Sequence, residues 1–270
     1  MIMSKECLPV LEAPLFPIFD SHAHYDSEQF DADREPLLSS TLPQKGVVGV
    51  INMGSDLPGC LATLDLCKRF DYVYGAVGIH PECAKNLPED WLSQVEGWLG
   101  QEKIVAVGEI GLDYHWLDAC PKERQQEVFE AQLQLANRLG LPVVVHDREA
   151  HADTLDFLRR ARPKGVVHCF SGSLETAREV LSLGMYIGLG GVVTFKNARH
   201  AVDVAREIPL ERLLLETDAP YMAPVPFRGM RNDSSLIRYV IQRVAEIRGV
   251  GPEAVAGAAL SNTKKLFSIG

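Results

Sequence analysis

The sequence predicts an α/β fold, a closed (β/α)8 or TIM barrel, because short apolar runs alternate with amphipathic segments of helical length. Eight runs have the character of buried strands, at residues 18–20, 47–53, 72–78, 104–109, 142–146, 165–169, 185–189 and 213–217. The chain has 270 residues, close to the size of about 250 that is typical of one such barrel. A doubly wound open sheet is the alternative, but no glycine-rich phosphate loop follows the first run. We therefore expect a single domain.

The clearest of the helical segments is 122–139. Val128 and Leu133 fall on its apolar face, Pro121 suits its first turn, and Gly140 follows its end. Further segments with helical periodicity lie at 57–70, 88–99, 150–161, 174–183, 197–207 and 234–248.

Residues that can bind a metal stand at the ends of five of the expected strands. They are Asp20-Ser21-His22-Ala23-His24, Gly108-Glu109, Val145-His146, Val167-His168 and Thr217-Asp218. The carboxyl ends of all strands in a parallel barrel meet at one rim, which holds the active site. Any one of these residues alone has an ordinary structural interpretation, such as a cap or a hydrogen-bonded histidine. Together they predict one metal site at the C-terminal rim.

The residue types indicate how two ions could share this site. Alternate residues of an extended chain point the same way, so His22 and His24 form half of a first site, which Asp218 completes. Glu109 has two oxygens and can bridge to a second ion. His146 and His168 complete that second site.

The expected chemistry is hydrolysis by a metal-activated water. We expect two divalent cations, and the ligand types do not distinguish Mg, Mn and Zn. A pair of such ions lowers the pKa of a water between them, with Asp218 as a general base and Glu109 as the second catalytic carboxylate.

The net charge and the cysteine content bear on the expected binding surface and on the cellular compartment. The net charge of −9 argues against a broad basic face that grips duplex DNA. The six cysteines form no C-x-x-C pair, and we expect free thiols in a reducing compartment. Residues 1–17 resemble neither a signal peptide nor a membrane anchor. We therefore expect a cytoplasmic protein without membrane association. Its oligomeric state is open, with a monomer as the expectation.

Five motifs resemble those of the TatD family of metal-dependent deoxyribonucleases, within the amidohydrolase-like barrels. They are FDSHAHYD at 19–26, GIHP at 78–81, VGEIGLDY at 107–114, HCFSG at 168–172 and ETDAPY at 216–221. The resemblance covers about residues 18–267 and implies a TIM barrel, a dinuclear divalent site and hydrolysis of DNA phosphodiester bonds. It also implies metal ligands at His22, His24, Glu109, His146, His168 and Asp218.

Three details qualify the resemblance. The family's basic loop usually ends Arg-Asn-Glu-Pro, where this chain has Arg231-Asn232-Asp233-Ser234. Glu109 stands where the wider superfamily often has a carboxylated lysine, which favours the TatD branch. Residues 1–17 precede the first strand as an N-terminal extension, so the hydrolase domain is expected at 18–270.

Side chains expected near the same rim are candidates for substrate contact. They are His80, Arg148, Arg228, Arg231 and Tyr114. Arginines suit phosphate oxygens, and the Tyr114 region could stack an unpaired base. An ordinary exposed or packing role is the alternative for each of them.

The leading hypothesis from the sequence is a deoxyribonuclease, a hydrolase of ester bonds that acts as an exonuclease on single-stranded DNA. The alternative enzyme is an esterase, amidase or deacylase acting on a small molecule or on aminoacylated nucleic acid. A metal-stabilised binding protein is the non-enzymatic alternative.

Overall fold

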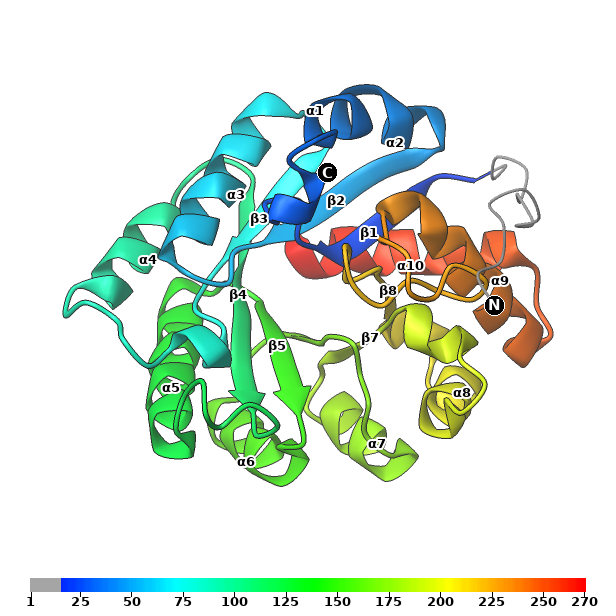
Figure 1. Ribbon diagram of the computed structural model, residues 1–270. Coiled ribbons are helices and arrows are strands. Elements are labelled where there is room, and N and C mark those ends of the chain that lie inside the picture. The colour runs from blue at the N-terminus through cyan, green and yellow to red at the C-terminus, as the bar shows by residue number, and fades with distance from the viewer. Residues whose placement is uncertain (1–15) are drawn as a thin grey trace.

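The computed structural model describes residues 16–270, in which eight parallel strands form the expected barrel (Figure 1). The strands are β1 (Ile18–Ala23), β2 (Val47–Met53), β3 (Val73–Val77), β4 (Ile104–Asp113), β5 (Val143–Arg148), β6 (Gly165–Val167), β7 (Tyr186–Leu189) and β8 (Leu213–Leu215). Each strand pairs with the next in sequence order. A parallel bridge between Ala23 and Ala219 joins β1 to the chain after β8. The predicted single-domain (β/α)8 barrel is confirmed.

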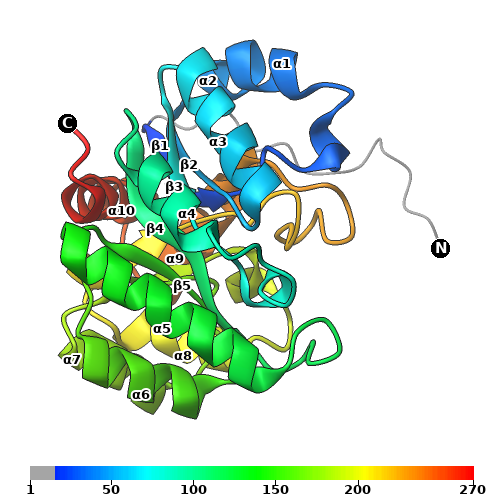
Figure 2. The same cartoon turned by 90° about the vertical axis from the view of Figure 1, so that its left-hand side faces the viewer.

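Helices surround the strands (Figures 1 and 2). They are α1 (Arg34–Pro36), α2 (Leu42–Gln44), α3 (Leu57–Arg69), α4 (Trp91–Leu99), α5 (Lys122–Leu139), α6 (His151–Ala161), α7 (Leu174–Ser182), α8 (Arg199–Glu207), α9 (Ile237–Arg248) and α10 (Pro252–Phe267). The side chains of Asp56 and Ser173 accept backbone N–H groups in the first turns of α3 and α7, which caps these helices. Gly140 ends α5 with φ 70°, a left-handed conformation that glycine adopts without steric cost.

α10 and the short α1 and α2 were not among the helices expected from the sequence. The buried side of α10 consists largely of small and polar residues such as Ala256, Ala259 and Asn262, so its apolar periodicity is weak. Asn262 Nδ2 donates to the carbonyl oxygens of Leu210 and Leu213, which attaches α10 to the start of β8. Tertiary contacts therefore stabilise a helix whose hydrophobic pattern alone is weak.

Strands β1, β4 and β5 run further than expected, whereas β6 and β8 each end two residues earlier than expected. β4 continues past Glu109 because its ladder with β5 extends to the pair Asp113 and Arg148. Gly111 allows this close approach, since a Cβ there would lie 2.8 Å from the carbonyl carbon of His146. Glu109 is therefore in the middle of β4, and its carboxylate still reaches the centre of the rim.

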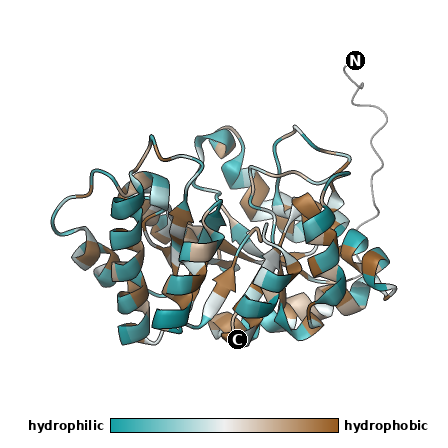
Figure 3. Ribbon diagram, turned by 90° about the horizontal axis from the view of Figure 1, so that it is seen from below, coloured by the Kyte–Doolittle hydropathy of each residue, from teal (hydrophilic) through white to brown (hydrophobic). Residues whose placement is uncertain are grey.

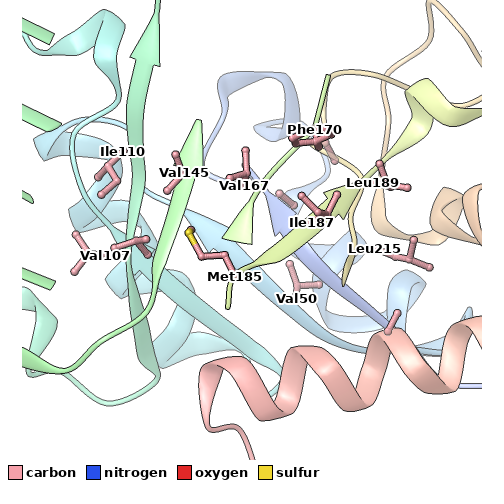
Figure 4. Close-up of a cluster of buried hydrophobic side chains, with 14 of the residues drawn as sticks. Val50, Val107, Ile110, Val145, Val167, Phe170, Met185, Ile187, Leu189 and Leu215 are labelled. Carbon is pink, nitrogen blue, oxygen red and sulfur yellow. The ribbon is translucent and has the colours of Figure 1, made fainter. Parts of the chain in front are cut away.

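Apolar side chains fill the barrel interior. Phe19, Val144 and Leu214 belong to one buried cluster, together with Phe267 and Ile269 from the C-terminal segment. A larger cluster lies between the strands and the helices, and Figure 4 shows part of it. The outward faces of the helices are mostly hydrophilic (Figure 3).

Alternation along the strands places a polar layer above this apolar interior. Val144 and His146 share one face of β5, and the apolar strand β8 is followed directly by the polar Glu216, Thr217 and Asp218. The inner face is therefore apolar at the N-terminal side of the barrel and carries potential ligands at the C-terminal side.

Three further expectations concern the chain as a whole. The N-terminal extension, residues 1–17, lies outside the described residues apart from Phe16 and Pro17. In residues 16–270 no helix has both the length and the apolarity required to span a bilayer. The five cysteines in this range are free thiols.

Candidate metal centre

Four of the predicted ligands form a first group around one oxygen of Glu109. Glu109 Oε2 lies 3.3 Å from His22 Nε2 and 3.4 Å from His24 Nε2. Asp218 Oδ1 lies 3.6 Å and 3.4 Å from the same two nitrogens, which are 3.1 Å apart. Donor atoms about 2.0–2.1 Å from a tetrahedral ion are about 3.3–3.4 Å from one another. The spacing therefore suits one divalent cation.

The other oxygen of Glu109 belongs to a second group. Glu109 Oε1 lies 2.6 Å from His168 Nε2 and 3.0 Å from His146 Nδ1, and these two nitrogens are 3.3 Å apart. The sequence-based inference required Glu109 to lie close to both His22 and His168, which it does. All six predicted ligands come together, with Glu109 between the two groups.

The buried charges of this region also fit bound cations. The carboxylates of Asp20, Glu109, Asp113 and Glu216 are buried, whereas no lysine or arginine within residues 16–270 is buried. Buried charge without a partner of opposite sign costs several kcal/mol per ion. The imidazoles offset the negative charge of these carboxylates only when they are protonated. Divalent cations would offset the same charge while the histidines are neutral.

Burial and the contacts between imidazoles and carboxylates shift the pKa values of these side chains in opposite directions. Burial by itself would raise the pKa of Glu109, but the imidazoles of His168 and His22 lower that pKa well below its usual value. Burial would lower the pKa of His24, but hydrogen bonds with Asp218 and Glu109 raise it well above its usual value. Ligands must lose their protons to bind a metal, so loading the centre releases protons.

Two of the imidazoles are oriented by acceptors behind them. His24 Nδ1 lies 3.2 Å from Met53 O, a carbonyl that only accepts, so in the neutral ring Nδ1 carries the proton and Nε2 offers its lone pair. His146 Nε2 likewise donates to Asp113 Oδ2 at 3.0 Å, so in the neutral ring Nδ1 is the nitrogen that can bind a cation. Sequence reasoning assigned no role to Asp113. Its spacing of four residues from Glu109 along one strand was the available signal, since residues at even spacing share a face.

Asp20 joins the segment that carries His22 to the segment that carries Asp218. Asp20 Oδ1 accepts the N–H groups of His22 and Thr217 at 3.2 and 3.0 Å, and Oδ2 accepts Thr217 Oγ1 and Ser234 Oγ at 2.5 and 2.6 Å. Burial raises the pKa of Asp20 to about 7 against the opposing effect of these hydrogen bonds. Because Thr217 precedes Asp218, Asp20 holds the backbone beside two ligands. This role was also missed.

His80 is the substrate candidate nearest the centre. Its Nδ1 accepts the N–H of Glu82 at 3.3 Å, so the ring proton is on Nε2, which lies 3.7 Å from Glu109 Oε1. Burial, with His146 as the next cause, lowers the pKa of His80 to about 3. The residue is therefore a neutral N–H donor that faces the ligands, and its contact with substrate stays a prediction.

Tyr114 and Arg148 lie near the ends of β4 and β5. The Tyr114 hydroxyl donates to Asp153 Oδ2 at 2.7 Å, and Lys122 Nζ lies 4.6 Å from the centre of its ring. The guanidinium of Arg148 is exposed and lies 5.8 Å from the ring of Trp116, itself 47% exposed. Trp116 therefore offers a more open aromatic surface than Tyr114.

Arg228 and Arg231 lie in the loop after β8 but differ in their contacts. Arg228 is exposed and lies over the ring of Phe195 at 4.5 Å. Arg231 forms a bidentate ion pair with Asp33, with both N–O distances 2.6 Å, and covers the ring of Phe30 at 4.7 Å. The substrate contacts expected of both arginines stay predictions, and the guanidinium of Arg231 already has an anionic partner.

Tyr221 is an exposed aromatic residue beside the centre that sequence reasoning did not select. Its ring lies 6.3 Å from the ring of His24 and is 51% exposed. Its backbone is held firmly, because its N–H donates to Asp218 O at 2.8 Å and Asn232 Nδ2 donates to its carbonyl at 2.7 Å. Its position three residues after Asp218 was the available signal.

The chain is similar to known proteins over nearly its whole length. A family model described as TatD related DNase matches residues 19–268. The chain is 40% identical over 255 residues to the uncharacterized metal-dependent hydrolase YabD of Bacillus subtilis, covering 93% of this chain and 99% of that protein. It is 39% identical over 258 residues to the uncharacterized metal-dependent hydrolase YcfH of Escherichia coli, covering 93% and 96%.

A solved structure shows the same likeness in three dimensions. The crystal structure of YjjV, a TatD homologue from Escherichia coli, matches with a TM-score of 0.88 at 36% identity, covering 94% of this chain and 98% of that chain. The matching family model, the identity with these hydrolases and the shared barrel lead to one conclusion. The chain belongs to the TatD family of metal-dependent hydrolases.

Proposed function

We propose that this protein is a deoxyribonuclease that hydrolyses phosphodiester bonds of single-stranded DNA from an end, at a centre of two divalent cations. The observation that carries the proposal is the position of Glu109, whose two oxygens face separate ligand groups. The residues of these groups would hold the cations, which would supply the electrostatic stabilisation that the attacking and leaving oxygens need in the in-line displacement of a phosphodiester.

The residues around the ligands suit this reaction. Divalent cations in such a centre act as Lewis acids and make bound water more acidic. Asp218 has a side chain that is 18% exposed, more than the 4% of Glu109, so it has better access to a water molecule. Burial would raise the pKa of Asp218, but its hydrogen bond with His24 and the nearby imidazoles lower it. Asp218 is therefore ionised at neutral pH before a cation binds. We assign it as the base that accepts a proton from the attacking water because of its better access to water.

Contacts outside the ligands favour a single strand over a duplex. The Nε2–H of His80 and the exposed guanidinium groups of Arg148 and Arg228 provide local donors for phosphate oxygens. Trp116 and Tyr221 are exposed aromatic residues, and such faces stack unpaired bases. The net charge of −9 disfavours a long phosphate-binding surface.

The test combines metal removal with a panel of substrates. The protein is stripped with a chelator, reloaded separately with Mg, Mn or Zn, and given single-stranded and duplex DNA labelled at the 5′ or the 3′ end. We expect no cleavage without metal, and progressive shortening of single strands from one end after reloading. Asp218→Asn should reduce the rate at least about 100-fold.

A small ester, a small amide and an aminoacylated RNA complete the panel. Cleavage of one of these without any turnover of DNA would reject the nuclease proposal in favour of an esterase, amidase or deacylase. Cleavage of DNA by the fully metal-free protein would reject the role of the cations.

A further inference from the structure

His24 and His146 each donate a ring N–H to an acceptor, whereas His168 has no such acceptor behind its ring at hydrogen-bond distance among the described residues. Its Nδ1 has no hydrogen-bond partner within residues 16–270, although the atom is buried. When Nε2 of a neutral histidine binds a cation, the ring proton is on Nδ1, and that N–H needs an acceptor. Glu216 Oε1 lies 3.6 Å from this nitrogen. A shift of about half an ångström would bring the two atoms within hydrogen-bond distance.

Glu216 is itself an unusual buried carboxylate. The residue is 1% exposed, and its Oε2 also has no hydrogen-bond partner in the described part of the chain. Its Oε1 accepts the backbone N–H of Cys169, the residue that follows His168. Glu216 therefore contacts the chain beside His168 and approaches its imidazole.

The barrel leaves space for this carboxylate. A Cβ at Gly188 on β7 would lie 2.9 Å from the carboxyl carbon of Glu216 and 3.1 Å from Cα of His168. Any side chain at position 188 would therefore displace Glu216 or His168. Glu216 directly follows β8 and precedes the candidate ligand Asp218 by two residues.

We propose that Glu216 is a positioning residue for the second cation: when the centre is loaded it accepts a hydrogen bond from the Nδ1–H of His168 and so orients Nε2 toward the ion. Glu216 would then do for His168 what Asp113 does for His146. The inference rests on the two-cation centre proposed above, but it does not depend on DNA being the substrate.

The test measures metal binding without any substrate. Glu216→Gln keeps an oxygen that can accept the N–H of Cys169. It removes the negative charge beside His168, so a hydrogen bond from His168 Nδ1 to that oxygen is no longer charge-assisted. Glu179→Gln is the matched control, since Glu179 is exposed and ion-paired with Arg159 on the surface. The metal-free wild type and both variants are titrated with Zn in the presence of a competing chelator. Urea unfolding of the metal-free proteins is measured in parallel.

For Glu216→Gln we expect the affinity for one of two Zn ions to fall about 10- to 100-fold, with the other changed by less than about 3-fold. His168→Ala should weaken the same binding step, which identifies that step. Metal-free stability should stay near that of the wild type, and Glu179→Gln should bind both ions normally.

Wild-type affinity for both ions in Glu216→Gln would overturn the inference, as would an equal loss at both sites together with reduced metal-free stability. A wild type that binds fewer than two ions would instead refute the two-cation centre. The two failures are therefore distinguishable.

Discussion

Replacing Asp113 with asparagine isolates the contribution of one hydrogen bond to the metal centre. Asp113 is fully buried, and its Oδ2 accepts the Nε2 proton of His146 at 3.0 Å. Its Oδ1 accepts the N–H groups of His115 and Trp116 at 2.9 and 3.2 Å, and an asparagine oxygen can keep both of these bonds. The new NH2 group would then face the Nε2–H of His146, donor against donor. His146 must lose this bond or move its proton to Nδ1, the atom that would bind the second cation.

The magnitude follows from the charge-assisted character of the lost bond. Hydrogen bonds to charged groups contribute about 1.5–3 kcal/mol, which corresponds to a factor of about 10–150 in an equilibrium constant. We therefore expect Asp113→Asn to lower the affinity for the second cation by about that factor. The affinity for the first cation should change by less than about 3-fold. The step that weakens should be the same as in His146→Ala.

Zn titration against a competing chelator measures both affinities, and metal analysis after gel filtration provides an independent check. Circular dichroism of the metal-free variant serves as the control for folding. Second-site affinity within 2-fold of wild type in a folded variant would refute the claim that Asp113 orients His146.

Three further predictions concern contacts around the rim. Tyr221→Ala should raise KM for single-stranded DNA about 10-fold and leave metal content unchanged, because stacking on an aromatic ring contributes about 1–3 kcal/mol per base. Tyr221→Phe keeps the ring and should behave like wild type. Equal KM values for the wild type and both variants would exclude stacking on Tyr221. Arg231→Ala should lower the free energy of unfolding by about 1 kcal/mol or less, with little change in KM, because Arg231 already pairs with Asp33. A large rise in KM with unchanged stability would instead support the substrate contact expected from the sequence. The hydrogen bond with Asp147, 2.7 Å long, raises the pKa of His151, so its stabilisation is complete below about pH 6.5 and is lost as the pH rises through the raised folded-state value. His151→Asn should therefore cost more stability in urea unfolding at pH 6 than at pH 8.5, and an equal cost at both would contradict this linkage.

Much of the centre was predictable from the sequence because its ligands lie at or beside the ends of apolar runs. Burial of a strand appears in the sequence as a short apolar segment, and a parallel barrel brings the ends of such segments to one rim. The six candidate ligands could therefore be selected without knowing any distance. The helix α5 was predicted with its observed bounds because its amphipathic pattern is long and regular.

Other features depend on contacts between segments that are distant in sequence, which periodicity does not report. α10 has a weak apolar pattern, and its hydrogen bonds with the residues around the start of β8 exist only after the barrel closes. The pairing of Arg231 with Asp33 joins residues 198 positions apart. In the same way, only the folded barrel brings Asp113 behind His146 and Glu216 near His168.

The sequence by itself determined the fold class and the set of residues that could bind cations. Only the tertiary structure decided how the two oxygens of Glu109 divide these residues into two groups, and which carboxylates lie behind the imidazoles. The physical reason is that hydrophobic periodicity records which residues are buried, whereas the direction of a lone pair depends on atoms that the fold brings within a few ångströms.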